Sequence, residues 1–184
     1  MLELAAAEVR AALRPQTGRD WSVPAGSLSW SCRETAVHIA HDLLAYAGQV
    51  AGQPSTAYLP LDLTVRPSAS TDDVLDVVLA CAGLLAAAVA GAEPSARGWH
   101  WGPTDPDGFA ALGVNEMLVH TYDITSGLGV SWAAPAALCS AVVDRLFPDA
   151  PAGEPFAVLL WCTGRAPLGN RPRRESWTLR AALS

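Results

Sequence analysis

The sequence contains no lysine, and all twelve of its basic residues are arginines. Eighteen acidic residues outnumber them, so the formal net charge at pH 7 is −6. A protein that binds nucleic acid through its phosphates needs a basic surface that displaces counterions. The composition therefore predicts that nucleic acid is not a partner.

Charged residues are also scarce, at 16%, whereas 51% of the residues are hydrophobic. This balance excludes a generally disordered chain, which needs low hydrophobicity and a high net charge. The 184 residues suit one domain, and a domain of this size buries about 70% of the surface that its unfolded chain exposes. We predict a single domain over residues 1–184.

The sequence has no pair of closely spaced cysteines. Its four cysteines stand far apart in the chain, at positions 32, 81, 139 and 162. Zinc ribbons and thioredoxin-type sites need C-x-x-C spacing, so neither is expected. A free cysteine behaves as a small apolar residue, and we predict four reduced cysteines in the core.

No segment has the pattern of a signal peptide or of a clear membrane span. Glu3, Glu8 and Arg10 interrupt the apolar residues at the N-terminus, which indicates an amphipathic helix rather than a leader. The most apolar stretch, residues 74–90, contains Asp76 and falls short of the ~20 residues that cross a bilayer. We expect a buried helix there, no membrane partner and a cytoplasmic protein.

Proline and glycine divide the chain into helices. Two starts carry strong signals: Ser31 and Glu34 have the spacing of a capping box, and Asp105 precedes a proline as an N-cap residue would. The expected helices span residues 2–13, 32–50, 70–91, 105–127, 135–147 and, less regularly, 155–162. Residues 58–65 alternate in hydrophobicity, but Pro60 excludes a central sheet position, so an extended segment is expected. Residues 176–183 are weakly strand-like. The predicted fold is all-α, an antiparallel four-helix bundle with short extra helices and a minor extended segment.

The fourth expected helix carries a stripe of polar residues within an apolar face. Glu116 and His120 lie between apolar residues at helical spacing, so both should point inward. A buried glutamate is costly unless it is paired or bound to a metal. On the second expected helix, His38 lies between two apolar residues. Two imidazoles and one carboxylate bind a divalent metal on one face and leave positions open for water or substrate.

Spacing alone leaves alternatives open at these positions. The histidines could be hydrogen-bonded core residues, with Glu116 paired to Arg33 or Arg97. His41, three residues after His38, could exchange roles with it or lie at the rim of the pocket. Asp123, three residues after His120, could orient the imidazole or be solvated.

Three segments resemble a known family. Residues 30–38, W-S-C-R-E-T-A-V-H, resemble W-T-V-R-D-x-x-x-H of the mycothiol-dependent maleylpyruvate isomerase N-terminal domains, which belong to the DinB-like superfamily of metal-binding four-helix bundles. Residues 108–124, G-F-A-A-L-G-V-N-E-M-L-V-H-T-Y-D-I, resemble the more specific family segment G-F-A-A-M-G-V-x-E-x-L-V-H-T-x-D-I. Residues 159–165, L-L-W-C-T-G-R, resemble its C-terminal L-L-W-A-T-G-R.

This resemblance implies a metal site and a thiol cofactor. It places a divalent metal, usually zinc, on His38, Glu116 and His120, and it implies a low-molecular-weight thiol such as mycothiol or bacillithiol. A thiol on zinc is deprotonated and becomes a nucleophile. The isomerase carries a further C-terminal domain that this sequence does not contain, so a substrate other than maleylpyruvate is expected.

Three further residues are candidates for binding the cofactor or substrate. Arg97 and Trp101 belong to a basic, aromatic loop just before the metal-bearing helix, and this loop could border the pocket and receive an anion. Burial of its tryptophans could equally serve only to pin the loop. Arg165 is a candidate carboxylate binder.

The sequence thus favours a metal-dependent enzyme of the thiol S-transferase or isomerase type. In this hypothesis a thiol or a water, activated by the metal, attacks a small electrophile. The alternatives are a non-catalytic metal- or ligand-binding protein and a metal-dependent hydrolase. A homodimer also remains open, and no catalytic residue is assigned.

Overall fold

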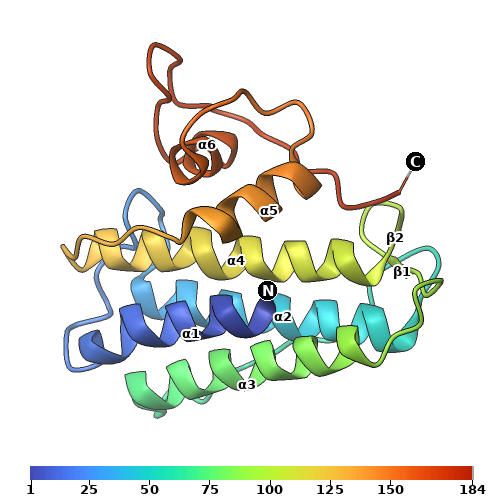
Figure 1. The fold of residues 1–184 in the computed structure, drawn as a ribbon. Coiled ribbons are helices and arrows are strands. Elements are labelled where there is room, and N and C mark those ends of the chain that lie inside the picture. The colour runs from blue at the N-terminus through green and yellow to red at the C-terminus, as the bar shows by residue number, and fades with distance from the viewer. Residues whose placement is uncertain (184) are drawn as a thin grey trace.

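The computed structural model describes residues 1–183, and these are mostly helical (Figure 1). The described residues form six α-helices and two very short strands. The helices are α1 (Leu2–Leu13), α2 (Cys32–Gly52), α3 (Thr71–Ala90), α4 (Pro106–Gly127), α5 (Ala136–Leu146) and α6 (Pro155–Cys162). A single 3-10 turn, η1 (Arg14–Gln16), extends α1.

The predicted helix starts are confirmed by their caps. Ser31 caps α2: its hydroxyl accepts a hydrogen bond from the Glu34 amide, and the Glu34 carboxylate accepts one from the Ser31 amide at 2.7 Å. Ser70 and Asp73 form the same box at the start of α3. Asp105 caps α4, with Pro106 in its first turn. These local bonds satisfy amides that the first turn of a helix leaves free.

Helices α1 to α4 lie side by side (Figure 1), and each of α1 and α2 packs against both α3 and α4. Gly113 of α4 lies where all four meet. A Cβ atom at this position would lie 2.4 Å from Leu85 of α3 and 3.1 Å from Leu2 of α1 and Leu43 of α2. The close approach of the helices therefore requires a glycine here.

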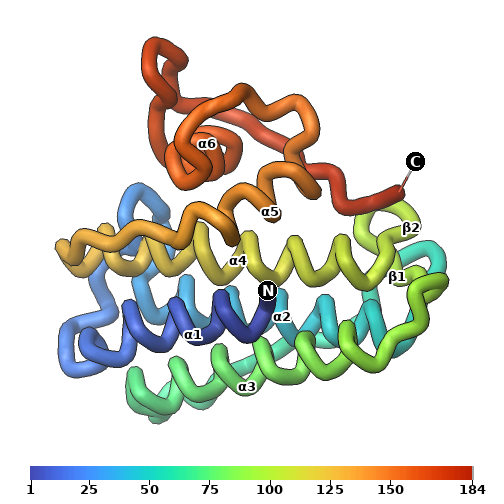
Figure 2. Tube along the Cα trace, in the orientation of Figure 1, coloured from blue at the N-terminus to red at the C-terminus, as the bar shows by residue number. Residues whose placement is uncertain are grey.

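Helix α4 is also covered on its other side. Helix α5 packs on α4, and α6 packs on α5 (Figure 2). Seventeen of the 22 residues of α4 are buried as a result. The segment after α6 then runs back past these helices. The amide of Arg180 donates a hydrogen bond to the carbonyl of Leu146 at 2.8 Å, and the amide of Leu183 donates one to the carbonyl of Pro103, also at 2.8 Å.

The structure corrects the expectations for extended segments. A hairpin that was not expected joins β1 (Gly98–Trp99) to β2 (Pro103–Thr104), in antiparallel register. Residues 58–65 are extended and pack on the core through Leu63 and Val65. Residues 176–183 form no strand, although they were expected to be weakly strand-like. An alternating pattern becomes a strand only where another strand lies beside it to pair with.

The four cysteines are free and buried, as predicted. Within the described residues, α3 is the helix long and apolar enough to cross a membrane, with a mean hydropathy of 2.1 over its most apolar window. A core helix of a soluble protein meets the same criterion. Only 33% of that window is buried, so α3 covers the core with one face and leaves the other uncovered.

Candidate metal centre

Helices α2 and α4 run antiparallel and bring three predicted residues to one point. The start of α2 lies beside the end of α4, where the Cys32 thiol contacts the carbonyl of Ile124. Midway along, one ligand atom each from His38, Glu116 and His120 lies within 4.8 Å of the others. The Glu116 Oε2 atom is 3.2 Å from His120 Nε2 and 3.6 Å from His38 Nε2. These three residues are called the His–Glu–His cluster below.

The cluster is buried on one side and open on the other. Glu116 and His120 are 9% and 7% exposed, whereas the His38 side chain is 29% exposed. The two imidazole rings meet nearly edge to face, with centroids 4.9 Å apart. A small ligand can therefore approach the cluster past His38.

The electrostatics of the cluster favour a positive charge between carboxylates. Burial alone would raise the pKa of Glu116, but hydrogen bonds to His120 and His38 outweigh it and hold that pKa far below its usual range. Burial alone would lower the pKa of His120, but hydrogen bonds to Asp123 and Glu116 raise it to about 9. Two imidazole nitrogens and a carboxylate oxygen around one point suit a divalent first-row metal.

Asp123 orients His120 by contacting the ring nitrogen that faces away from the cluster. Its Oδ2 atom is 2.9 Å from His120 Nδ1, which leaves Nε2 facing Glu116 and His38. Asp123 is 2% exposed and is held in turn by Arg165, whose Nη2 and Nε atoms lie 2.8 and 3.3 Å from the two carboxylate oxygens. Burial alone would raise the pKa of Asp123, but the bonds to His120 and Arg165 lower it. Histidine ligands of metals characteristically donate their second ring N–H to such a carboxylate.

Asp42 is the carboxylate on the opposite side, beside His38. Its Oδ2 atom lies 3.5 Å from His38 Nε2 and accepts a long hydrogen bond, also of 3.5 Å, from the Tyr46 hydroxyl. Its other oxygen is 3.0 Å from His41 Nδ1. His41 therefore pairs with Asp42 rather than joining the cluster. The indole of Trp30 packs on the other side of His38, with ring centroids 4.9 Å apart.

An aromatic group lies within reach of the charges of Asp42 and Glu116. The His100 ring lies between Tyr46 and Tyr58, with centroids 6.0 and 5.9 Å away. Burial, together with the charges of Asp42 and Glu116, raises the pKa of Tyr58 to about 12. Burial lowers the pKa of His100. The side chains of this group are therefore neutral at pH 7.

Most of these neighbours were not predicted from the sequence. His38, Asp42 and Tyr46 recur every four residues along α2, so the stripe argument that found Glu116 and His120 on α4 would also have found Asp42 and Tyr46. No local pattern could place His100 beside Tyr46, because that contact depends on how the β1–β2 loop folds back.

The candidates for ligand binding lie in three different settings. Arg97 donates to two carbonyls of its own turn, those of Pro94 and Ala96. Trp101 is 82% exposed at the tip of the hairpin, with a positive φ of 56°. Arg165 is buried against Asp123, behind the cluster. Their roles in ligand binding stay predictions. The alternative pairing of Glu116 with Arg33 or Arg97 does not occur: its ion-pair partners are the two imidazoles.

Comparison with known proteins shows the family of this chain. A family model described as mycothiol maleylpyruvate isomerase N-terminal domain matches residues 2–125, well over half of the chain. The chain belongs to this family. The match confirms the resemblance seen in the first two motifs, residues 30–38 and 108–124, and includes all three residues of the His–Glu–His cluster. It ends two residues before the end of α4, so Arg165 lies outside the matched family segment. No curated protein and no solved structure matches the chain.

Proposed function

We propose that the His–Glu–His cluster binds a divalent metal ion, with zinc as the expected ion, in a DinB-like four-helix bundle. The observation that carries this proposal is the convergence of three donor atoms within 4.8 Å on two neighbouring helices. Three protein ligands leave at least one coordination position open, which is characteristic of catalytic rather than structural zinc sites. The exposed edge of His38 marks the side from which that position is reached.

The proposed activity is thiol activation. A bound zinc ion would stabilise the thiolate form of a small thiol such as mycothiol, which then attacks a small electrophile in an S-transferase or isomerase reaction. Membership of the mycothiol-linked family supports the choice of thiol. The alternative, in which a water takes the place of the thiol, would make the protein a hydrolase.

The chain's own residues would divide the remaining tasks. Asp123 and Arg165 hold His120 with Nε2 toward the cluster. The Oδ2 atom of Asp42, 3.5 Å from His38 Nε2, would accept the proton that a thiol releases. Trp30, which is partly exposed and packs on His38, would offer an apolar ring face to the ligand.

Metal analysis followed by cobalt substitution tests this proposal. Purified protein should bind one equivalent of metal, and a small thiol added to the cobalt form should produce a sulfur-to-metal charge-transfer band. The S-methylated thiol is the matched control and should produce none. A stoichiometric cobalt protein that shows no band at saturating thiol would contradict thiol activation and favour a hydrolase or a non-catalytic metal protein.

A further inference from the structure

The outward face of α3 carries no charge along most of its length. Every residue from Val77 to Ala92 is uncharged and apolar. The exposed positions in this stretch include Ala80, Gly83, Leu84 and Ala87, and Leu84 is 53% exposed. A surface helix of a globular protein normally turns polar residues outward, whereas a helix that is apolar all round is normally covered. The sequence of α3 therefore indicates that another surface covers this face.

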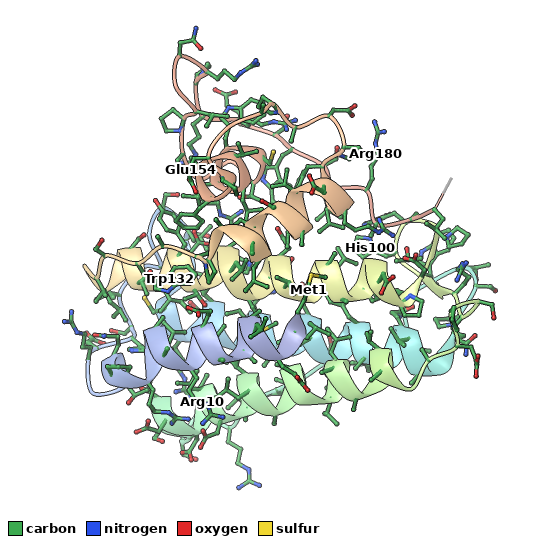
Figure 3. The ribbon with its side chains drawn as sticks, in the orientation of Figure 1. Met1, Arg10, His100, Trp132, Glu154 and Arg180 are labelled. Atoms are coloured by element: carbon green, nitrogen blue, oxygen red, sulfur yellow. The ribbon has the colours of Figure 1, made fainter. Side chains whose placement is uncertain are left out.

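Helix α1 extends the same face. It runs antiparallel to α3, since Arg14 at its end pairs with Asp72 and Asp76 at the start of α3. Between the two helices lies a groove of about 260 Å³, and a second hollow of about 270 Å³ continues it toward the N-terminus. The main groove is lined by small and apolar side chains and by two charged ones, among them Glu3, Ala6, Ala7, Arg10, Ala82 and Gly83. Figure 3 labels Arg10 where it projects beside α3.

The two charged residues of the groove indicate what covers it. Glu3 and Arg10 are seven residues apart, so they lie on the same side of α1, two turns from each other. A two-fold axis through the middle of the groove would place Glu3 opposite Arg10 of the partner subunit, and Arg10 opposite Glu3 of the partner subunit. Such a surface is complementary to itself, as the interface of a symmetric dimer must be.

A membrane surface fits this face less well. Amphipathic helices that bind membranes carry lysine or arginine along the edges of their apolar face, because lipid headgroups are largely anionic. Here the N-terminal end of α3 bears Asp72, Asp73 and Asp76, and the groove carries one acidic and one basic side chain. The charges match a second copy of the chain better than an anionic lipid surface.

The face has the size of a weak, reversible interface. Helix α3 has 20 residues and α1 has 12, which at 1.5 Å per residue are about 30 and 18 Å, so two adjacent helices about 10 Å wide give a face on the order of 500 Å². Stable interfaces bury about 800 Å² per partner, with the smaller ones near 600 Å². A reversible dimer is expected from these dimensions.

We propose that two copies of the chain associate through the α1–α3 face about a two-fold axis. Leu84 of each copy packs into the groove of the other, and Glu3 pairs with Arg10 of the partner subunit. The proposal is independent of the metal site, because α1 and α3 contribute no residue to the His–Glu–His cluster.

Charge reversal tests the proposed symmetry. We expect sedimentation analysis over a wide concentration range to show a reversible dimer for the unmodified protein. The two-fold axis repeats the contact between residues 3 and 10, so either single substitution, Glu3→Arg or Arg10→Glu, creates two pairs of like charges. Each single variant should therefore raise the dimer dissociation constant about tenfold or more. The double variant Glu3→Arg/Arg10→Glu should restore the original value to within a few-fold. Glu8→Arg, on the same helix but outside the groove, is the matched control and should leave dimerisation unchanged.

A second substitution tests the apolar contact. Leu84→Asp should abolish the dimer while leaving the circular dichroism spectrum and the melting temperature of the monomer intact, because the side chain is largely exposed. Leu183→Asp, an exposed leucine elsewhere on the surface, should not affect association. The proposal is overturned if the unmodified protein is monomeric at the highest concentration, if the double reversal fails to restore a weakened dimer, or if the monomer instead sediments with anionic lipid vesicles through Leu84.

Discussion

Asp123 binds the Nδ1 atom of His120 at 2.9 Å, on the side of the imidazole ring away from Glu116. When the imidazole is neutral, the carboxylate thus selects the tautomer in which Nε2 carries the free lone pair and points at the cluster. Since Arg165 holds Asp123 in turn, the orientation of the ring depends on two consecutive contacts that link His120, Asp123 and Arg165. The first prediction removes the middle member of this series.

Asp123→Asn should weaken metal binding about 10- to 100-fold, the usual effect of losing a carboxylate behind a histidine ligand. An amide can still occupy the site and accept a hydrogen bond from His120, but it accepts more weakly than a carboxylate and does not balance the charge of Arg165. Competition with a chromophoric chelator measures the change. Asp62→Asn is the control, because Asp62 is exposed and its ion-pair partner among the described residues is His41, at 3.5 Å, rather than a member of the cluster. Unchanged affinity in Asp123→Asn would contradict the orienting role.

Replacing His38 and replacing His41 should have different effects on metal binding. His38→Ala should remove stoichiometric metal, because a three-ligand site does not readily lose one ligand. His41→Ala should retain it, because that ring pairs with Asp42 and Asp62 instead. Native mass spectrometry of the two variants gives the metal content directly. Loss of metal in His41→Ala alone would show that the two histidines exchange roles.

Metal affinity should rise with pH up to about pH 9. The pKa of His120 is raised to about 9 in the folded protein, so a metal that takes Nε2 must displace a proton below that pH. One released proton makes the affinity change about tenfold per pH unit. The affinity of the unmodified protein should therefore increase between pH 7 and 9 and then level off. A flat profile over this range would contradict the raised pKa.

The pH dependence of the free energy of unfolding of the metal-free protein should follow the titration of the same groups. The stabilising contribution of His120 is fully present below its unfolded pKa of 6.5 and is lost as the pH rises through about 9. Glu116 and Asp123 have lowered pKa values, so their contribution is present above their unfolded values of 4.5 and 3.8 and is lost as the pH falls. Urea unfolding should show greatest stability between about pH 5 and 6.5. In His120→Gln, the decline above pH 6.5 should disappear.

Gly113→Ala should destabilise the protein by about 1–3 kcal/mol, the typical cost of overpacking a core. The new methyl would lie 2.4 Å from a Leu85 methyl, between four helices that cannot all move apart. Gly83→Ala on α3 is the matched control, measured at a dilution where the protein is monomeric. Nothing lies within 4 Å of its new methyl, and alanine favours a helix interior by up to about 1 kcal/mol. Equal effects of the two substitutions would contradict the proposed packing at Gly113.

The features that the sequence predicted correctly are those encoded locally. Caps such as Ser31 and Asp105 use bonds within four residues, so the helix starts could be recognised from spacing alone. The inward stripe on α4 was likewise readable, because Glu116 and His120 are one turn apart. The family motifs added the same residues independently.

The features that were missed depend on contacts between distant segments. Arg165 contacts Asp123 from 42 residues further along the chain. The sequence indicated that Arg165 could bind a carboxylate, but it could not identify Asp123 as that carboxylate. The β1–β2 hairpin has two residues in each strand, too few to give an alternating pattern. His100 meets Tyr46 only because that hairpin folds against the end of α2.

The boundary of the family match falls inside α4, a helix whose far face is covered by α5. During evolution, a recombination that joined residues 2–125 to an unrelated continuation would leave that face without its cover. It would also leave Asp123 without the cation that now neutralises it. The segment around Arg165 is therefore expected to be inherited together with the helices before it.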